Sequence, residues 1–441
     1  MTPAAFRALE IRQAASSSSV KKLYSMRNQL TAAGRLHDLF SYHAARTGRV
    51  VGRGPQPTNL PTSWPPVHQC GACKEWFAAK HPVCPWCGVP PLPGKEPDEW
   101  CADAAECALR VLACRSPQLV EWYFGHVLDT IAGCLRALFI AADGCDLIGS
   151  DFNSIEAVVV ACVSGEQWRI DLFRGHGKVY EMGASKISGV PLDEMLEYRK
   201  RTGKHHPLRK MGKVSELASP YGGWVNSWIE FGAGEFMSEA EIKDAVIAWR
   251  EASPAVVHMW GGQQPGNFYG LEGAAISAVL CPEQVFHVNR LSGTPSGISY
   301  QMRGDALYCR LPSGRELTYH RPRLEQQERY GKTSWALSFE GWNTNPRVGP
   351  KGWIRIRTYG GRLFENVCQA IARDILRRAI VTLERHNYPL VMQVYDEVVC
   401  EVPEGCGSLE EVERIMGDLP EWCRDWPVRA SGGWRGRRFR K

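Results

Sequence analysis

The 441-residue sequence contains no long hydrophobic run. Its longest purely apolar stretch, AVVVACV, is far too short to span a bilayer, and the N-terminal MTPAAFRALEIRQ lacks the apolar core of a signal peptide. Internal repeats and extended low-complexity tracts are also absent, and the apolar and charged fractions of 44% and 23% are ordinary for a globular protein. The sequence therefore predicts a cytoplasmic protein of roughly two to four subdomains with no membrane partner.

Positive charge is concentrated at the two ends of the chain. The net charge is +6, but residues 1–60 carry +7 and residues 429–441 carry +6, which leaves −7 on the middle. Basic ends around an acidic centre suit a polyanionic partner, with metal ions at the centre, because Lys and Arg displace counterions from phosphates. The alternative is a pair of solvated basic tails.

Disulfides are not expected, although the chain has 16 cysteines, because cytoplasmic thiols stay reduced. Four of them follow the pattern C-x2-C-x10-C-x2-C: Cys70, Cys73, Cys84 and Cys87. Two such turns can present four thiolates to one zinc ion, which would provide much of the folding free energy of so small a segment. We therefore predict a structural zinc site, with His68 and His81 as bystanders; the alternative is four unrelated buried cysteines.

Hydrophobic periodicity separates helical from β regions. Short helices are expected within residues 5–40 and 99–138, and a mostly helical region from 154 to about 260. Residues 285–358 alternate apolar and polar positions between turn signals, which predicts β-hairpins. A long amphipathic helix is expected over 365–387, and LVMQVYDEVVCEV, residues 390–402, reads as a hairpin with a polar tip.

Acidic residues occur where two predicted strands end. The stretch LIGSDFNSIEAVVV delivers Asp151 at a strand end, and a helix follows with Asn153 or Ser154 as N-cap and Glu156 in its first turn. At the hairpin tip stand Asp396 and Glu397. If the strands are neighbours, their carboxylates converge and could hold two hard cations about 4 Å apart for phosphoryl transfer. Either segment alone is more often a solvated turn.

The segment LRKMGKVSELASPYGGW lies between these acids. It repeats functional side chains every four residues, which in a helix form one stripe: Arg209, Lys213, Leu217 and Tyr221. Two cations followed by an aromatic ring could bind a triphosphate and stack on a base. The alternative is a solvated basic helix face. Pro220 should end or kink this helix, because proline removes a hydrogen bond and clashes with the preceding turn.

The order of these segments resembles motifs A, B and C of the family A DNA polymerases, the bacterial DNA polymerase I group, and most closely its phage-type members. ARTGRVVGRGPQPTNLP is similar to the family's segment before the palm, and GRLFENVCQAIARDIL resembles the family helix that tracks primer–template DNA. The resemblance covers nearly everything from residue 15 onward, apart from the cysteine-rich insertion. If the chain is phage-encoded, its location would be the host cytoplasm.

The resemblance implies a role for each matching residue. Asp151 and Asp396 would bind two Mg²⁺ ions with the carbonyl of Phe152, and Glu397 and Lys213 would assist catalysis. The incoming nucleotide would contact a second set, in which Glu156 is the steric gate against ribose: Glu156, Arg209, Lys213, Leu217, Tyr221 and Tyr180. Primer–template DNA would contact a third set: Arg46, Arg49, Arg362, Asn366, Gln369 and Tyr395.

The resemblance also implies an α+β right-hand fold with an antiparallel palm sheet, helical fingers, a reduced thumb and an inserted zinc ribbon. The expected units are a residual thumb and primer–template segment at 1–61, the zinc ribbon at 62–98, palm at 99–165, fingers at 166–284, and palm with a basic tail at 285–441.

Some family features differ or are missing. Leu217 stands where many members have Phe or Tyr, Tyr395 replaces a usual His, and Asn366 and Gln369 are one residue closer than in the bacterial pattern. Only about 42 residues precede His43, and no Asp-x-Glu exonuclease start is visible. These differences predict an enzyme without its own proofreading, and suggest a second protein chain that supplies exonuclease or thumb functions.

Three other functions share some of these features. A single-subunit RNA polymerase would have a small residue at position 156 and no Glu after Asp396. A two-metal nuclease would leave the cationic stripe without a purpose. A non-catalytic nucleic-acid-binding subunit would not need Asp151, Asp396 and Arg209 together. The sequence therefore favours template-directed synthesis of DNA from deoxynucleotides.

Overall fold

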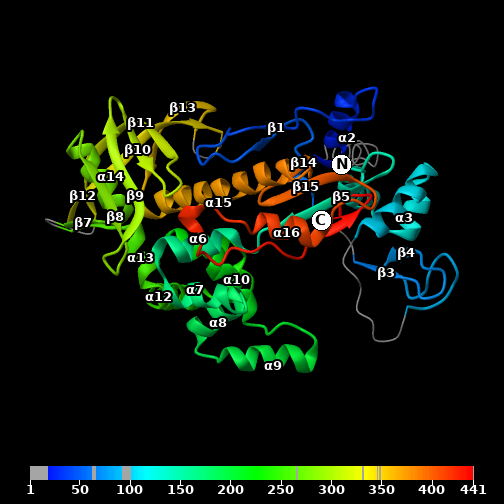
Figure 1. The fold of residues 1–441 in the computed structure, drawn as a ribbon. Helices are drawn as coiled ribbons and strands as arrows, with labels where there is room; N and C mark the ends of the chain where they lie inside the picture. The colour runs from blue at the N-terminus through cyan, green and yellow to red at the C-terminus, as the bar shows by residue number, and fades with distance from the viewer. Residues whose placement is uncertain are drawn as a thin grey trace, which may run out of the picture.

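The computed structural model describes residues 18–61, 66–91, 101–264, 267–329, 332–344, 346 and 349–440. A long helix, α15 (Gly360–Arg385), runs through the middle of the molecule, between a six-stranded sheet at one end and a four-stranded sheet at the other (Figure 1). A lobe of helices lies along one side of α15. The helices expected before residue 18, and residues 62–65 and 92–98 of the predicted insertion, fall outside the described ranges.

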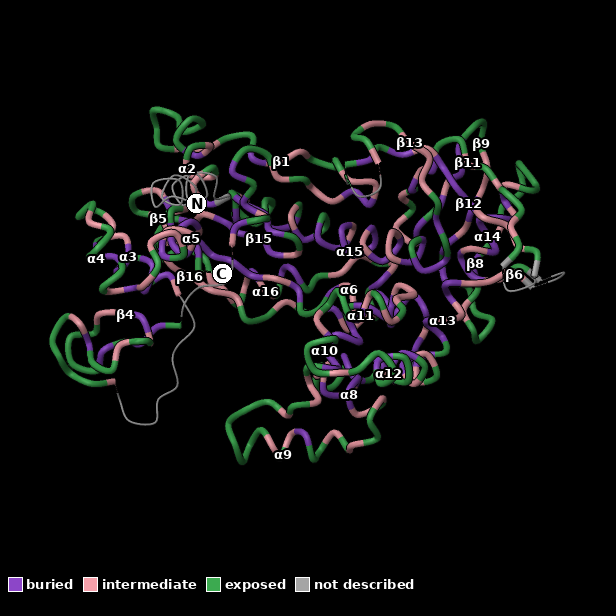
Figure 2. Tube along the Cα trace, turned by 180° about the vertical axis from the view of Figure 1, so that it is seen from behind, coloured by how far each residue is buried: buried purple, intermediate pink, exposed green. Residues whose placement is uncertain are grey.

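The four-stranded sheet carries the two predicted acidic segments. It is antiparallel, in the order β14-β15-β5-β16, with bounds Leu390–Val394, Glu397–Pro403, Cys145–Asp151 and Trp434–Gly436. Strands β14 and β15 are joined by the two-residue loop Tyr395-Asp396, which confirms the expected hairpin. Buried residues of β5, β15 and α15 meet beneath the sheet, and Figure 2 shows this central region mostly buried.

The second sheet is formed by the region where hairpins were expected. Its six strands are antiparallel neighbours in chain order: β8 (Val285–Asn289), β9 (Pro295–Arg303), β10 (Ala306–Arg310), β11 (Glu316–Arg329), β12 (Lys332–Asn343) and β13 (Gly352–Thr358). Helix α14 (Gly270–Leu280) packs against it. These strands form a sheet of their own, whereas the sequence interpretation grouped 285–441 in one unit, because strand periodicity does not tell which sheet a strand joins.

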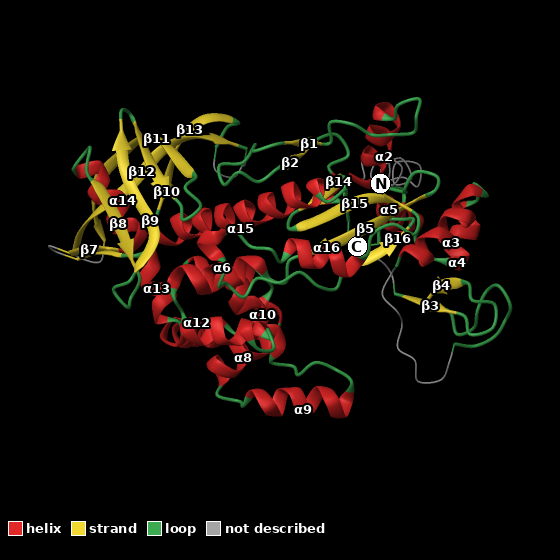
Figure 3. Ribbon diagram, viewed as in Figure 1, coloured by secondary structure: helices red, strands yellow, loops and turns green. Residues whose placement is uncertain are grey.

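The helical lobe begins directly after β5 (Figure 3). Its helices are α6 (Ile155–Ser164), α7 (Gln167–Arg174), α8 (Val179–Ser188), α9 (Leu192–Thr202), α10 (Arg209–Ala218), α11 (Val225–Glu230), α12 (Glu239–Ala252) and α13 (Pro254–Trp260). Helix α10 ends before a 3-10 turn at Ser219–Tyr221, as Pro220 predicted. A short hairpin of β6 (Gly262–Gln264) and β7 (Asn267–Tyr269) then leads to α14.

A buried ion pair fixes α10 within this lobe. The side chains of Arg169 and Glu216 are 1% and 2% exposed and form an ion pair. Glu216 also accepts a hydrogen bond from the indole nitrogen of Trp249 at 3.1 Å. A buried carboxylate is tolerated only when such partners replace its lost hydration.

Glu216→Ala should therefore lower the free energy of unfolding by about 3–5 kcal/mol, because it leaves the Arg169 charge buried without its partner. Urea denaturation followed by circular dichroism measures the change. The exposed Glu230 of α11 provides the matched control, since Glu230→Ala should shift stability by less than about 0.5 kcal/mol. A similar small shift for both variants would contradict the role given to the buried pair.

The remaining elements surround the four-stranded sheet. They are α2 (Ser18–Gln29), β1 (Phe40–Ser41), β2 (Val51–Gly52), β3 (Val67–Gln69), β4 (Trp76–Ala78), α3 (Ala102–Ala113), α4 (Pro117–Tyr123), α5 (Val127–Ala137) and α16 (Leu409–Met416). None of the helices in the described ranges combines the length and hydropathy needed to cross a bilayer.

The C-terminal tail is part of the sheet and its arginines have acidic partners. Arg435 pairs with Asp146 at 2.9 Å, and Arg437 with Asp143 at 2.6 Å. Arg438 lies 3.4 Å from Glu106 of α3. These contacts with acids distant in sequence offset part of the positive charge at this end of the chain, and the polyanionic partner stays a prediction.

Candidate active site and metal centres

The two predicted acidic segments meet at one edge of the four-stranded sheet. The register pairs Glu397 of β15 with Asp151 of β5, so Asp396, one residue earlier in the hairpin loop, lies beside the end of β5. Asp151 and Asp396 are both half-buried. Tyr395 has a φ of 55°, a left-handed conformation that is uncommon for a non-glycine residue and typical of tight two-residue hairpins. The predicted convergence of the two aspartates is confirmed.

Glu397 lies inside the sheet rather than at its surface. Its side chain is 1% exposed and accepts a hydrogen bond from the indole nitrogen of Trp434 at 3.1 Å. The Trp434 ring lies across Gly149, where any Cβ would collide with it. The glycine therefore allows the tryptophan to reach Glu397, and this contact holds at least one carboxylate oxygen away from the surface.

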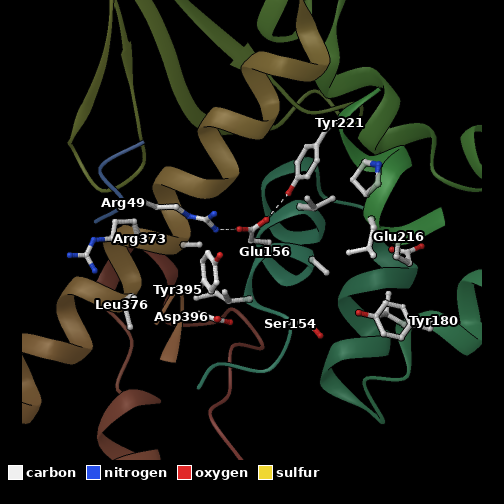
Figure 4. Close-up of a pocket in the computed structure, with 17 residues that line it drawn as sticks. Arg49, Ser154, Glu156, Tyr180, Glu216, Tyr221, Arg373, Leu376, Tyr395 and Asp396 are labelled. Atoms are coloured by element: carbon white, nitrogen blue, oxygen red, sulfur yellow. Dashed lines mark hydrogen bonds and ion pairs between the residues drawn. The ribbon is translucent and has the colours of Figure 1, made fainter. Parts of the chain in front are cut away.

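A cavity of about 330 Å³ opens next to Asp396 (Figure 4). It lies between α6, α8, the end of α10, α15 and the β14–β15 loop. Seven of its lining residues belong to the sets predicted from the sequence: Arg49, Glu156, Tyr180, Leu217, Tyr221, Tyr395 and Asp396. Residues separated by more than 300 positions in the chain are thus brought to one site.

Glu156 is held at the cavity wall by two partners. It forms an ion pair with Arg49 and accepts a hydrogen bond from the hydroxyl of Tyr221 at 3.5 Å, as the dashed lines in Figure 4 mark. Burial lowers the pKa of Arg49 and raises that of Tyr221. Glu156 lies in the first turn of α6, and Ser154 is its N-cap residue. Both features agree with the sequence prediction.

The predicted cationic stripe lies on α10, but its members differ in their contacts. Arg209 bonds through Nε to Glu181 at 2.8 Å and its guanidinium lies over the Tyr180 ring at 5.0 Å. Lys213 is exposed, and Leu217 and Tyr221 line the cavity. Helices α8 and α10 approach closely at Gly212, since glycine has no Cβ and a Cβ at this position would collide with the carbonyl of Tyr180.

The residues predicted to contact DNA lie on three segments: the one that carries Arg46 and Arg49, helix α15, and the β14–β15 loop. On α15, Arg362 is exposed, Gln369 donates to Glu365 at 3.2 Å, and Asn366 donates to the hydroxyl of Tyr319 at 3.2 Å. Arg46 lies over the Phe339 ring at 4.0 Å. The hydroxyl of Tyr395 donates to the side chain of Asn59 at 3.2 Å. Of these residues Tyr395 lines the cavity, as Arg49 does, and the others lie away from its lining.

Comparisons with known proteins agree with this geometry. No family model matches the chain. It is 34% identical over 430 residues to the DNA polymerase of Bacillus phage SP02, which covers 97% of the chain but only 56% of the relative. Its structure resembles the POL domain of Pol1 from M. smegmatis, solved in complex with a DNA primer-template and dNTP, with a TM-score of 0.51 and 17% sequence identity. The match covers 96% of this chain and 51% of the M. smegmatis chain.

The chain has the polymerase-domain fold of the DNA polymerase I group. The predicted α+β polymerase architecture is thereby confirmed, and the phage relative is similar to this chain as the resemblance implied. The chain spans about half the length of the relatives that it matches. Neither comparison supports a second protein chain as a partner.

Sequence reasoning missed a charged residue of this cavity. Arg373 of α15 lines the cavity and is buried. Its Nε donates to the carbonyl of Gly48 at 3.2 Å, and an Nη atom donates to the side chain of Gln393 at 3.1 Å. It therefore ties the segment that carries Arg49 to β14. Its position four residues after Gln369, on the same predicted helix face, was the available signal.

The four predicted zinc ligands are brought together at the far end of the polymerase fold. Their ligand atoms all lie within 4.8 Å of one another. The Sγ atoms of Cys70 and Cys87 are 3.5 Å apart, and those of Cys73 and Cys84 are 3.7 Å apart. Tetrahedral zinc with bonds of about 2.3 Å needs sulfurs about 3.8 Å apart, so the cluster could hold this ion.

Both cysteine turns have the same backbone geometry. The amide of Lys74 donates to the carbonyl of Cys70 at 3.1 Å, and that of Gly88 donates to the carbonyl of Cys84 at 2.8 Å. Lys74 and Gly88 have φ values of 62° and 77°. Such paired turns present two sulfurs each to one centre, as the spacing predicted. All sixteen cysteines lie in the described ranges and none forms a disulfide.

We expect the purified chain to contain about one zinc ion, and Cys84→Ser to lose it, because Cys84 is one of four converging sulfurs. Elemental analysis after gel filtration measures the stoichiometry, and hydrogen exchange over residues 66–91 should rise in the variant. Cys281→Ser, at an exposed cysteine outside the cluster, should retain the ion. Zinc retained by Cys84→Ser would contradict the predicted site.

Proposed function

We propose that the chain is a template-directed DNA polymerase that adds deoxynucleotides to a primer 3′-OH. The observation that carries the proposal is the convergence of Asp151 and Asp396 beside a cavity walled by Glu156, Leu217 and Tyr221. A nuclease would need the acids but not this cavity wall. The chain spans only 56% of its phage relative, and its DNA polymerase activity is therefore proposed here.

Two Mg²⁺ ions fit the donor set at the sheet edge. Asp151 and Asp396 offer half-buried carboxylates from two adjacent backbones, which is the hard oxygen chemistry that Mg²⁺ prefers. Phe152 would add its backbone carbonyl, and Glu397 would act from behind the site. When bound, such ions stabilise the attacking and leaving oxygens of an in-line phosphoryl transfer.

The other cavity residues would position the nucleotide. Lys213 is exposed on the outer face of α10, where its ammonium would reach the triphosphate. Arg209, whose side chain is 29% exposed, would join it by exchanging its contact with Glu181 for a phosphate oxygen. Tyr180 and Leu217 would lie against the nucleotide, and Tyr221 against the nascent base pair.

The DNA would lie along α15. Arg362, Asn366 and Gln369 recur at helical spacing and would contact the primer–template minor groove, where contacts can be independent of sequence. Arg49 and Tyr395 would lie nearest the primer end, and Arg46 behind them. We further propose that the cysteine cluster holds a structural zinc ion. The units 1–61, 62–98, 99–165, 166–284 and 285–441 would act as thumb remnant, zinc ribbon, palm, fingers and palm with a basic tail.

Primer extension with the purified chain tests the proposal. A labelled primer annealed to a longer template, with Mg²⁺ and all four dNTPs, should be extended to the template end. The same reaction with ribonucleotides should give little product, which separates the proposal from an RNA polymerase. Degradation of the primer without extension would indicate a nuclease instead, and no change in the primer would contradict catalysis by this chain.

A further inference from the structure

The six-stranded sheet has one face with an unusual set of exposed side chains. The register between β12 and β13 pairs Trp342 with Trp353 and Glu340 with Arg355. Residues paired in this way point to the same side of a sheet, and alternate residues share that side. Arg357 therefore joins them. We call Trp342, Trp353, Arg355 and Arg357 the tryptophan–arginine face.

This face is open to solvent, whereas the opposite face is core. Trp342 and Trp353 are 54% and 61% exposed, and their rings lie edge to face with centroids 6.3 Å apart. The alternate residues Leu337 and Phe339 are 2% exposed, and they pack in the main core. Two large neighbouring aromatic rings at the surface are not required by the fold, which indicates a surface for binding.

Of the two arginines of the face, Arg357 has only a weak internal partner, whereas Arg355 is 25% exposed and also donates to the carbonyl of Arg321 at 3.1 Å. Arg357 lies 3.3 Å from Glu325, and these side chains are 72% and 53% exposed. Arg355 lies 3.2 Å from Glu340. Exposed ion pairs contribute little to stability, so a phosphate can replace Glu325 at small cost. Arg321 and Arg323 lie exposed on the adjoining strand, so positive charge is in excess at this face.

A second cavity lies between Arg357 of this face and the residue that follows Tyr221 of the active-site cavity. It has a volume of about 830 Å³ and lies between the fingers-like lobe, the sheet and the start of α15. Arg357 and Tyr359 line it from the sheet side, and Gly222 and Trp224 line it from the lobe. Gly222 directly follows Tyr221 of the active-site cavity. A nucleic-acid strand that passes Tyr221 would therefore enter this cavity and then reach Arg357.

We propose that the tryptophan–arginine face binds the single-stranded template ahead of the primer end. Exposed rings stack on unpaired bases without regard to sequence, and neighbouring arginines contact the backbone phosphates. The inference rests on the proposed function, because it assigns the strand by its continuity with the polymerase cavity. It adds a binding surface that the six-stranded sheet provides, outside the active-site cavity.

Fluorescence anisotropy with labelled primer–templates tests the assignment. One substrate ends flush, and the other carries a 5′ template overhang of about ten nucleotides, long enough to cross a stacking surface. The wild-type chain should bind the overhang substrate more tightly. Trp342→Ala combined with Trp353→Ala should reduce that preference by about tenfold or more, and leave binding of the flush substrate unchanged. For the overhang substrate, the logarithm of the binding constant falls linearly with the logarithm of the salt concentration. Arg357→Ala should reduce the steepness of this line by about one unit.

Trp122→Ala is the matched control. This tryptophan is 59% exposed on α4, beside the cysteine cluster at the other end of the molecule, so its loss should leave the overhang preference intact. An unchanged preference in the double tryptophan variant, or no preference in the wild type, would overturn the inference. So would light scattering that shows self-association lost in the double variant without any overhang effect, because the face would then join two copies of the chain. Failure of primer extension alone would count against the proposed function, since anisotropy measures binding without catalysis.

Discussion

Asp396→Asn is expected to slow nucleotide incorporation by about a thousandfold or more, because it removes a carboxylate charge where Mg²⁺ would bind. The substitution keeps the shape of the side chain at a half-buried hairpin loop, and asparagine tolerates turn geometry. Asp151→Asn should have a comparable effect. Single-turnover incorporation with saturating dNTP measures the rate, and thermal unfolding checks that the fold is intact.

The two aspartates should also behave as one unit. If both bind the same pair of ions, the double variant should be little slower than either single variant, because effects of residues that act together are not additive. Asp193→Asn, at an exposed aspartate in the first turn of α9, should retain the wild-type rate. Near wild-type incorporation by either active-site variant would remove that aspartate from the catalytic site.

Glu156→Ala is expected to reduce the preference for deoxynucleotides over ribonucleotides by about a hundredfold, because it removes the side chain proposed to crowd the ribose 2′-OH. Arg49 and Tyr221 both contact this carboxylate, so it is fixed at the cavity wall rather than free to move aside. The ratio of kcat/KM for the two sugars measures the change.

Glu156→Gln separates the steric effect from the charge. Glutamine keeps nearly the same volume and can still accept a hydrogen bond from Tyr221, but it loses the ion pair with Arg49. Discrimination should therefore persist in this variant even if the overall rate falls. Equal loss of discrimination in both variants would show that the ion pair, and not the bulk of the side chain, selects the sugar.

Local signals in the sequence were sufficient to predict where the residues at the centre of the candidate active site lie. Strand ends placed Asp151 and Asp396, helical spacing placed Leu217 and Tyr221 on one stripe, and Pro220 ended α10 where the chemistry of proline requires it. The CxxC spacing likewise brought four sulfurs within reach of one ion. In each case the governing interaction spans only a few residues, or the motif fixes which segments must meet.

Pairing between distant charges was the main feature that the sequence could not supply. Arg209 contacts Glu181 on a neighbouring helix, and Arg437 contacts Asp143 from nearly 300 residues away. A charge count treats each of these arginines as available to a ligand. Burial of Arg373 between Gly48 and Gln393 depends on the same long-range packing.

The second sheet shows the same limit for strands. Alternation of apolar and polar residues predicted hairpins over 285–358, but it did not distinguish a separate sheet from an extension of the four-stranded one. Hydrogen bonds between strands have no local sequence signature apart from the turns that join them. The tryptophan–arginine face became visible only when the register of β12 and β13 was known.

The most direct test of the central claim is whether the template selects the nucleotide. Four primer–templates that differ only in the first unpaired template base are each incubated with the purified chain, Mg²⁺ and one dNTP at a time. We expect one-nucleotide extension with the complementary dNTP in each case, and its loss in Asp151→Asn and Asp396→Asn. Extension that is independent of the template base, or that survives in both variants, would contradict it.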